Sequence, residues 1–82
     1  MTKINKLIAR IKSRPKDFGW HELTTLLNKL GFDELQGSGS RVKFYHEDED
    51  CLIQLHKPHP TRILKPYAIS EVLNILIIKG LI

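Results

Sequence analysis

Two short segments of alternating residues enclose a run of four acids, and this pattern constrains the fold more than any other feature. Residues 41–46 place Val42 and Phe44 at the apolar positions, residues 51–56 alternate in the same way, and residues 47–50 are all Glu or Asp. A period of two is typical of a strand with one buried and one solvent-facing side. The sequence therefore predicts a β-hairpin with an acidic tip.

The turn fixes the register of the two strands. If residues 46 and 51 close the hairpin, each residue before 46 pairs with the residue that lies the same number of positions after 51. Phe44 then lies opposite Ile53, and Val42 opposite Leu55, so these four apolar side chains share the core side. The other face of the hairpin is polar and cationic. It carries Arg41 opposite His56, Lys43 opposite Gln54, and Tyr45 on the same side.

Three segments outside the hairpin have the spacing of amphipathic helices. The first has apolar residues at i, i+3, i+4 and i+7 from Ile4, and it should end before Pro15. The second runs from an N-cap at Gly19 to a C-terminal glycine at Gly31. The third begins at Pro66, where a missing N–H costs nothing.

A weaker strand signal completes the order of elements. Residues 32–36 could form a short strand, although Asp33 and Glu34 are poor strand formers. The order α-α-β-β-β-α predicts an α+β fold, with a three-stranded antiparallel sheet and helices packed on one face. With 82 residues, of which 41% are hydrophobic, we expect a single domain spanning residues 1–82.

The net charge of +4 is concentrated at the N-terminus. Residues 1–16 hold six cations and no acid, whereas the rest of the chain has seven cations against nine acids. We therefore expect a basic amphipathic helix at residues 1–14, followed by the rest of the domain at residues 18–82. A polyanion-binding surface on residues 18–82 would need cations gathered on one face.

The cysteine content and the apolar runs bear on the cellular compartment. Cys51 is the only cysteine, so no internal disulfide can form, and no secretory leader precedes the first amphipathic segment. The longest apolar run, residues 75–78, is far shorter than the ~20 residues needed to cross a bilayer. We therefore expect a cytoplasmic protein that does not act at a membrane.

The polar face of the hairpin carries the residue types needed to cleave RNA. His56 could move protons near neutral pH, while Arg41 and Lys43 could hold the phosphate and offset charge on the transition state. His59 follows the strand between two prolines and could reach the same face, which makes it the reserve candidate. The alternative is that His56 is simply one of the polar residues that any exposed sheet face carries.

Other chemistries have weaker support. His56, His59 and Cys51 are too few ligands for a structural zinc site. We expect neither a metal nor a small-molecule cofactor. Ser38 and Ser40 lack a strand-to-helix nucleophile elbow, and we interpret them as turn residues.

A set of short motifs runs from Trp20 to the C-terminus: a helix closing with Leu-Gly-Phe at 30–32, a Gly-Ser-Gly-Ser turn at 37–40, an Ile-Gln-Leu-His strand at 53–56, and Leu-Lys-Pro at 64–66. Together they resemble the HicA family of bacterial toxins. The resemblance implies a fold like that of double-stranded-RNA-binding domains and a small endoribonuclease that cleaves mRNA. It also implies a partner, an antitoxin of the HicB type.

Two positions depart from the family pattern. A histidine usually follows the Gly-Ser turn and acts in RNA cleavage, whereas this chain has Arg41 there. Gly-Thr usually follows the Lys-Pro pair, whereas residues 67–68 are Tyr-Ala. Since His56 lies opposite Arg41 in the predicted register, the two could share the catalytic work. The sequence also fits a branch of the family that has lost activity.

The leading hypothesis is a toxin of a type II toxin-antitoxin system that cleaves mRNA without a metal and is neutralised by a HicB-type antitoxin. Its predicted catalytic residues are His56, Arg41 and His59. A non-catalytic RNA-binding or protein-interaction module on the same fold is the alternative. The residues expected to contact RNA are Lys43, Tyr45, Gln54, Lys57, Lys65 and Ser40.

Overall fold

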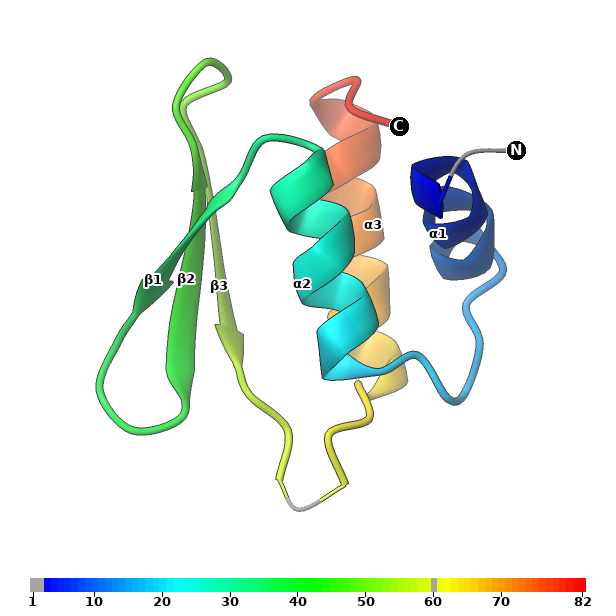
Figure 1. The fold of residues 1–82 in the computed structure, drawn as a ribbon, viewed down its shortest axis with the longest axis vertical. Helices are drawn as coiled ribbons and strands as arrows, with labels where there is room; N and C mark the ends of the chain where they lie inside the picture. Colours follow the sequence, from blue (N-terminus) through cyan, green and yellow to red (C-terminus); the bar gives the residue numbers. More distant parts are fainter. Residues whose placement is uncertain (1–2, 60) are drawn as a thin grey trace.

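The computed structural model describes residues 3–59 and 61–82. Its elements are α1 (Lys3–Lys12), α2 (Trp20–Lys29), β1 (Asp33–Gln36), β2 (Arg41–His46), β3 (Cys51–His56) and α3 (Pro66–Ile78). This order confirms the predicted α+β fold, including the short first strand. Figure 1 shows the sheet on one side, α2 and α3 beside it, and α1 on the far side of these two helices.

The strands form an antiparallel sheet in the order β1-β2-β3. β2 and β3 pair in the predicted register, with Arg41 opposite His56 and Lys43 opposite Gln54. Buried and exposed residues alternate along both strands. The register prediction is therefore confirmed, and a slip of one residue would turn every buried side chain of a strand to solvent.

The inward face of the hairpin packs against the helices and forms the core. Phe44 is fully buried, and its ring centroid lies 5.9 Å from that of Trp20 on α2. Val42 and Ile53 are each 2% exposed on the same face. The helices cover only this side of the sheet (Figure 1), so the opposite face of the β2–β3 hairpin is open.

The ends of α2 follow the predicted capping. At the N-terminus, Gly19 is extended and its N–H donates to Oε1 of Glu22 at 3.3 Å. At the C-terminus, Gly31 adopts φ +104°, and the Phe32 N–H donates to the Leu27 carbonyl at 2.9 Å. This is the Schellman closure expected from the sequence.

Within the described residues, the N-terminal helix ends two residues before the predicted end at residue 14. α1 ends at Lys12, and Arg14 turns the chain out of the helix at φ +52° immediately before Pro15. The helix stops here because the residue that precedes a proline is disfavoured in the α region. Residues 1 and 2 of the prediction lie outside the described residues.

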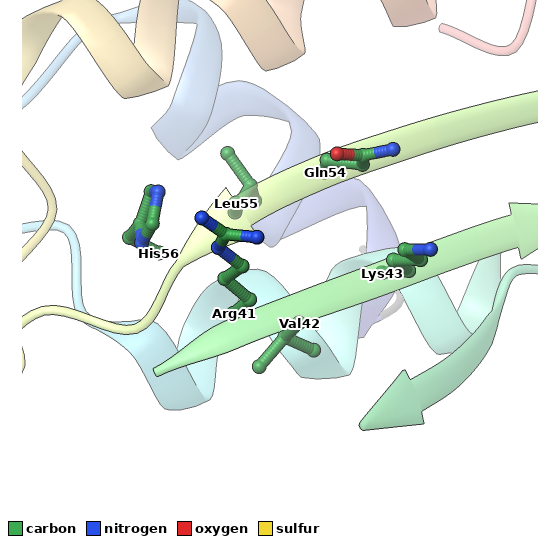
Figure 2. Close-up of a pocket in the computed structure, with 6 residues that line it drawn as sticks. All are labelled: Arg41, Val42, Lys43, Gln54, Leu55 and His56. Atoms are coloured by element: carbon green, nitrogen blue, oxygen red, sulfur yellow. The ribbon is translucent and has the colours of Figure 1, made fainter. Parts of the chain in front are cut away.

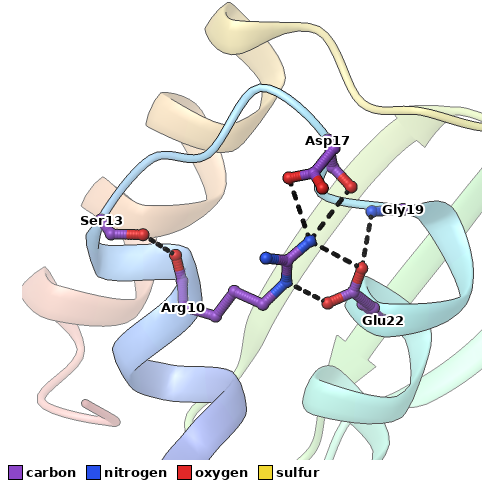
Figure 3. A network of polar contacts seen from close by, with 5 residues as sticks. All are labelled: Arg10, Ser13, Asp17, Gly19 and Glu22. Carbon is purple, nitrogen blue, oxygen red and sulfur yellow. Dashed lines mark hydrogen bonds and ion pairs between the residues drawn. The ribbon is translucent and has the colours of Figure 1, made fainter.

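The apolar stripe of α1 packs against the rest of the chain, in contact with α2 and α3. Ile11 is fully buried. The polar anchor is Arg10, whose guanidinium binds the Glu22 carboxylate on α2 and lies 3.1 Å from Oδ1 of Asp17 (Figure 3). It also lies over the Phe18 ring, 5.8 Å from the centroid. The partly buried members of the stripe are Ile4, Leu7 and Ile8.

The last helix begins at Pro66, as predicted, and runs for 13 residues. The buried residues of α3 form part of the hydrophobic core between the helices and the sheet. Among the described residues, no helix is long and apolar enough to cross a membrane. The buried residues of α3 are Ala68, Ile69, Val72, Leu73 and Leu76.

Candidate functional site

Four exposed polar side chains stand together on the open face of the hairpin. Arg41 and Lys43 come from β2, and Gln54 and His56 come from β3. In Figure 2 the Arg41 side chain reaches from β2 towards β3 and lies beside the His56 ring. We call these four residues the cationic sheet face, and they line a shallow depression on the sheet.

The Gly-Ser turn at 37–40 holds the start of β2 beside the end of β3. The Gly37 N–H donates to the Arg41 carbonyl at 2.9 Å, and the Lys57 N–H donates to the Ser40 carbonyl at 2.7 Å. A Cβ at position 37 would lie 2.9 Å from the Arg41 carbonyl oxygen, so this close approach requires glycine. The motif therefore positions both Arg41 and the end of β3 that carries His56.

His56 is held loosely at one ring nitrogen. Oγ of Ser40 lies 3.5 Å from Nδ1 of His56, at the long limit of a hydrogen bond. The ring is exposed, and within residues 3–59 and 61–82 it makes no other hydrogen bond. An imidazole with one free nitrogen can donate or accept a proton during a reaction.

A groove continues from His56 around the start of α3. Its lining includes His56, Lys57 and His59 from the end of β3 and the following loop, and Lys65 and Tyr67 from the start of α3. Lys57 and His59 also border a depression beside the Gly-Ser turn, which Ser40 lines as well. The loop after β3 thus brings the reserve candidate His59 and the predicted RNA contacts Lys57 and Lys65 next to the cationic sheet face.

Tyr45 lies on the same sheet face but further from His56. Its side chain is half-buried, and its hydroxyl donates to Oδ1 of Asp50 at 2.9 Å. This hydrogen bond raises the pKa of Tyr45 above its ordinary value. The hydroxyl is therefore engaged by the acidic tip, which leaves the ring as the part of Tyr45 that could stack on a base.

Most of the acids lie at one end of the sheet, where they outnumber the two nearby cations, Lys29 and Lys79. The start of β1 pairs with the end of β2, which brings two more acids beside the acidic tip. The other end carries Arg41, Lys57 and Lys65. A phosphate is therefore attracted to the His56 end and repelled from the tip. Six of the nine acids gather at the tip end, namely Asp33, Glu34, Glu47, Asp48, Glu49 and Asp50.

His46 has a structural role that the sequence analysis missed. It shares the inward face of β2 with Val42 and Phe44 and is only 8% exposed. Nε2 lies 3.0 Å from the Leu30 carbonyl, and Nδ1 accepts the Glu49 N–H at 3.2 Å. These partners suit a ring that carries its proton on Nε2. The alternation along β2 was the signal that could have identified His46 as an inward residue.

The histidine and cysteine side chains are dispersed. Cys51 is buried on the core side of β3, whereas His56 and His59 are exposed. In the part of the chain that the structure describes, no three His, Cys, Asp or Glu side chains are grouped so that they could hold a metal ion.

Residues 20–77 match a family model described as HicA toxin of bacterial toxin-antitoxin. The matched segment begins with α2, ends one residue before the end of α3, and contains every residue of the candidate site. α1 lies outside it. No match was found among curated proteins, and none among solved structures.

Proposed function

The chain belongs to the HicA family, toxins of bacterial toxin-antitoxin systems, and from this premise we propose that it is an endoribonuclease that cleaves mRNA. The observation that carries the proposal is the pairing of His56 with Arg41 on adjacent strands, two residues along each strand from the pair Lys43 and Gln54. These side chains offer a proton-transfer group and two cations for a phosphate within one open surface.

The proposed reaction uses the RNA as its own nucleophile. The 2′-hydroxyl attacks the adjacent phosphorus, the bond to the 5′-oxygen breaks, and the products end in a 2′,3′-cyclic phosphate and a 5′-hydroxyl. One group must accept the 2′ proton, and another must give a proton to the leaving oxygen. We assign His56 to one transfer and His59, which lines the same groove, to the other. The nucleophile belongs to the substrate and side chains supply the positive charge, so this route is metal-independent.

Arg41 takes a different role from the histidine that most family members have at its position. A guanidinium stays protonated, so it cannot serve as a general base near neutral pH. It presents several N–H donors in a plane and binds phosphate well. Arg41 and Lys43 would hold the phosphate as negative charge builds on its oxygens, and the proton transfers would fall to His56 and His59.

The remaining site residues suit contacts to the rest of the RNA. Lys57, Lys65 and Ser40 border the grooves around His56 and would bind phosphate or sugar oxygens. Gln54 could hydrogen-bond a base, and the Tyr45 ring could stack on one. We further propose that residues 18–82 form the toxin core and that the protein acts in the cytoplasm, where mRNA is found.

The proposed partner is a HicB-type antitoxin that covers the cationic sheet face. Covering this face would block both the phosphate-binding cations and His56. Because the face lies opposite the helices, an antitoxin could reach it without displacing any core side chain.

Growth arrest on induced expression tests the histidine assignment. Wild-type protein should arrest growth, and the antitoxin should relieve the arrest. His56→Ala should abolish it, because general acid-base catalysis contributes ~10²- to 10⁴-fold. His21→Ala, which removes an exposed histidine on α2, is the matched control and should remain toxic. Full toxicity of the His56→Ala variant would contradict the assignment. If only the His59→Ala variant lost toxicity, proton transfer would be assigned to the loop after β3.

Arg41 also favours one alternative function. A family member that lacks the usual histidine could keep the RNA-binding or antitoxin-binding surface and lose cleavage. Such a non-catalytic RNA-binding or protein-interaction module would bind RNA but fail to arrest growth. A neighbouring gene for a small antitoxin would favour the toxin, because an inactive chain needs no neutralisation.

A further inference from the structure

A group of five exposed cations lies on α1 and in the turn that follows it. Arg10 is different from these five cations, because its guanidinium forms ion pairs with Glu22 and Asp17. Those ion pairs are the only salt bridges among the described residues, so the five other cations have no carboxylate partner. They are Lys3, Lys6, Lys12, Arg14 and Lys16.

The apolar side of α1 is not available to a membrane. Ile11 is fully buried, and the rest of the stripe packs against the core. An amphipathic helix that binds a bilayer inserts its apolar face among the lipids, so α1 would have to leave the fold to do this. What α1 offers to a ligand is positive charge, which suits a hydrophilic polyanion.

The position of α1 separates it from the cationic sheet face. In Figure 1 the helix lies beyond α2 and α3, on the side of the molecule away from the sheet. It also lies outside residues 20–77, which match the family model. A ligand on α1 would therefore not compete for the sheet face, and a protein that covers the sheet face would leave α1 open.

We propose that α1 is a second RNA-binding surface, which contacts the phosphate backbone and stays available when an antitoxin covers the sheet. The identity of the polyanion rests on the proposed function. In a helix of 10 residues that rises 1.5 Å per residue, Lys6 and Lys12 lie about 9 Å apart along the axis, so each would contact a different phosphate. Such contacts hold RNA without reading its sequence.

The test is the salt dependence of binding to a single-stranded 2′-O-methyl RNA, measured by fluorescence anisotropy. This RNA lacks the nucleophile, so binding is read separately from cleavage. Lys6→Gln/Lys12→Gln removes two exposed cations of α1, and Lys29→Gln/Lys79→Gln removes the same charge elsewhere. Each lost phosphate contact changes the slope of log K against log salt by ~0.7. The α1 variant should lose about 1.4 in slope, and its affinity should fall about tenfold or more at low salt.

The control variant should keep the wild-type slope, and Lys6→Gln/Lys12→Gln should keep the wild-type thermal midpoint. Equal losses in the two variants would show that only net charge matters, and an unchanged slope in the α1 variant would place binding elsewhere. Either result overturns the proposal. So does binding to phosphatidylcholine–phosphatidylserine vesicles that depends on Lys6 and Lys12, if the RNA does not bind.

Two further outcomes separate this proposal from the proposed function. A chain that binds 2′-O-methyl RNA through α1 but does not cleave unmodified RNA contradicts the nuclease and supports the second surface. The complex with the antitoxin should still bind this RNA, and its binding should fall with Lys6→Gln/Lys12→Gln. A complex that binds no RNA would contradict the claim that α1 stays available.

Discussion

Replacing Gly31 with alanine should destabilise the fold well beyond the cost of an ordinary glycine substitution. Gly31 ends α2 at φ +104°, a conformation that side-chain-bearing residues rarely adopt. An added Cβ would also lie 2.8 Å from Nε2 of His46. The ring cannot move aside freely, because it is buried and bonded to the Leu30 carbonyl at 3.0 Å. The alanine variant must strain the backbone and displace the ring together.

The size of the effect follows from these two contributions. A left-handed conformation costs a residue with a Cβ roughly 1–2 kcal/mol. Losing the hydrogen bond between His46 and Leu30, with a partly buried group left unpaired, costs roughly 1–3 kcal/mol. Gly31→Ala should therefore lower the free energy of unfolding by about 2–5 kcal/mol, a large part of the ~5–15 kcal/mol typical of a small domain.

Urea unfolding monitored by the fluorescence of Trp20, the only tryptophan, would measure this loss. Gly39→Ala and Gly80→Ala are matched controls, because both glycines have positive φ and an added Cβ would meet nothing within 4 Å. The controls should lose only the backbone contribution, roughly 1–2 kcal/mol. If Gly31→Ala loses no more than they do, the contact with His46 does not constrain this position and the reasoning is refuted.

Two other predictions follow from the packing of α1 and from the acidic tip. Ile11→Ala should lower the free energy of unfolding by about 2–5 kcal/mol, because the side chain is fully buried. Deletion of residues 1–14 should lower the thermal midpoint. An unchanged midpoint would contradict the packing of α1 against the core. In a Tyr67→Phe background, the phenol of Tyr45 should titrate above pH 10.0, and Asp50→Asn should lower that pKa. Because the folded pKa is raised, the stabilisation is complete below about pH 10 and disappears as the pH rises through the folded value, which denaturation midpoints against pH would detect.

The hairpin could be predicted from the sequence because two independent features agree there. The alternation assigns each residue of β2 and β3 to a face, and the acidic tip sets the register. β1 is a harder case. All four of its residues, from Asp33 to Gln36, are exposed, so the strand has no apolar alternation to read. It forms because β2 supplies a hydrogen-bonding edge, and that contribution outweighs the low strand propensity of its acids.

The contacts that the sequence could not supply are those between distant elements. Arg10 is one of six cations in the first 16 residues, and nothing local marks it as the partner of Glu22. That choice depends on how α1 packs against α2. The groove shared by His56 and His59 likewise depends on the path of the loop towards α3. In contrast, the four residues of the cationic sheet face came together because strand pairing alone determines their positions.

The most direct test of RNA cleavage by the cationic sheet face is the incubation of purified protein with mRNA in the presence of EDTA, followed by analysis of the fragment ends. We expect wild-type protein to release fragments with 2′,3′-cyclic phosphate and 5′-hydroxyl ends. His56→Ala should cleave at least ~10²-fold more slowly, and His21→Ala should match the wild type. A folded wild-type chain that leaves RNA intact, or equal cleavage by His56→Ala, would contradict the proposed function.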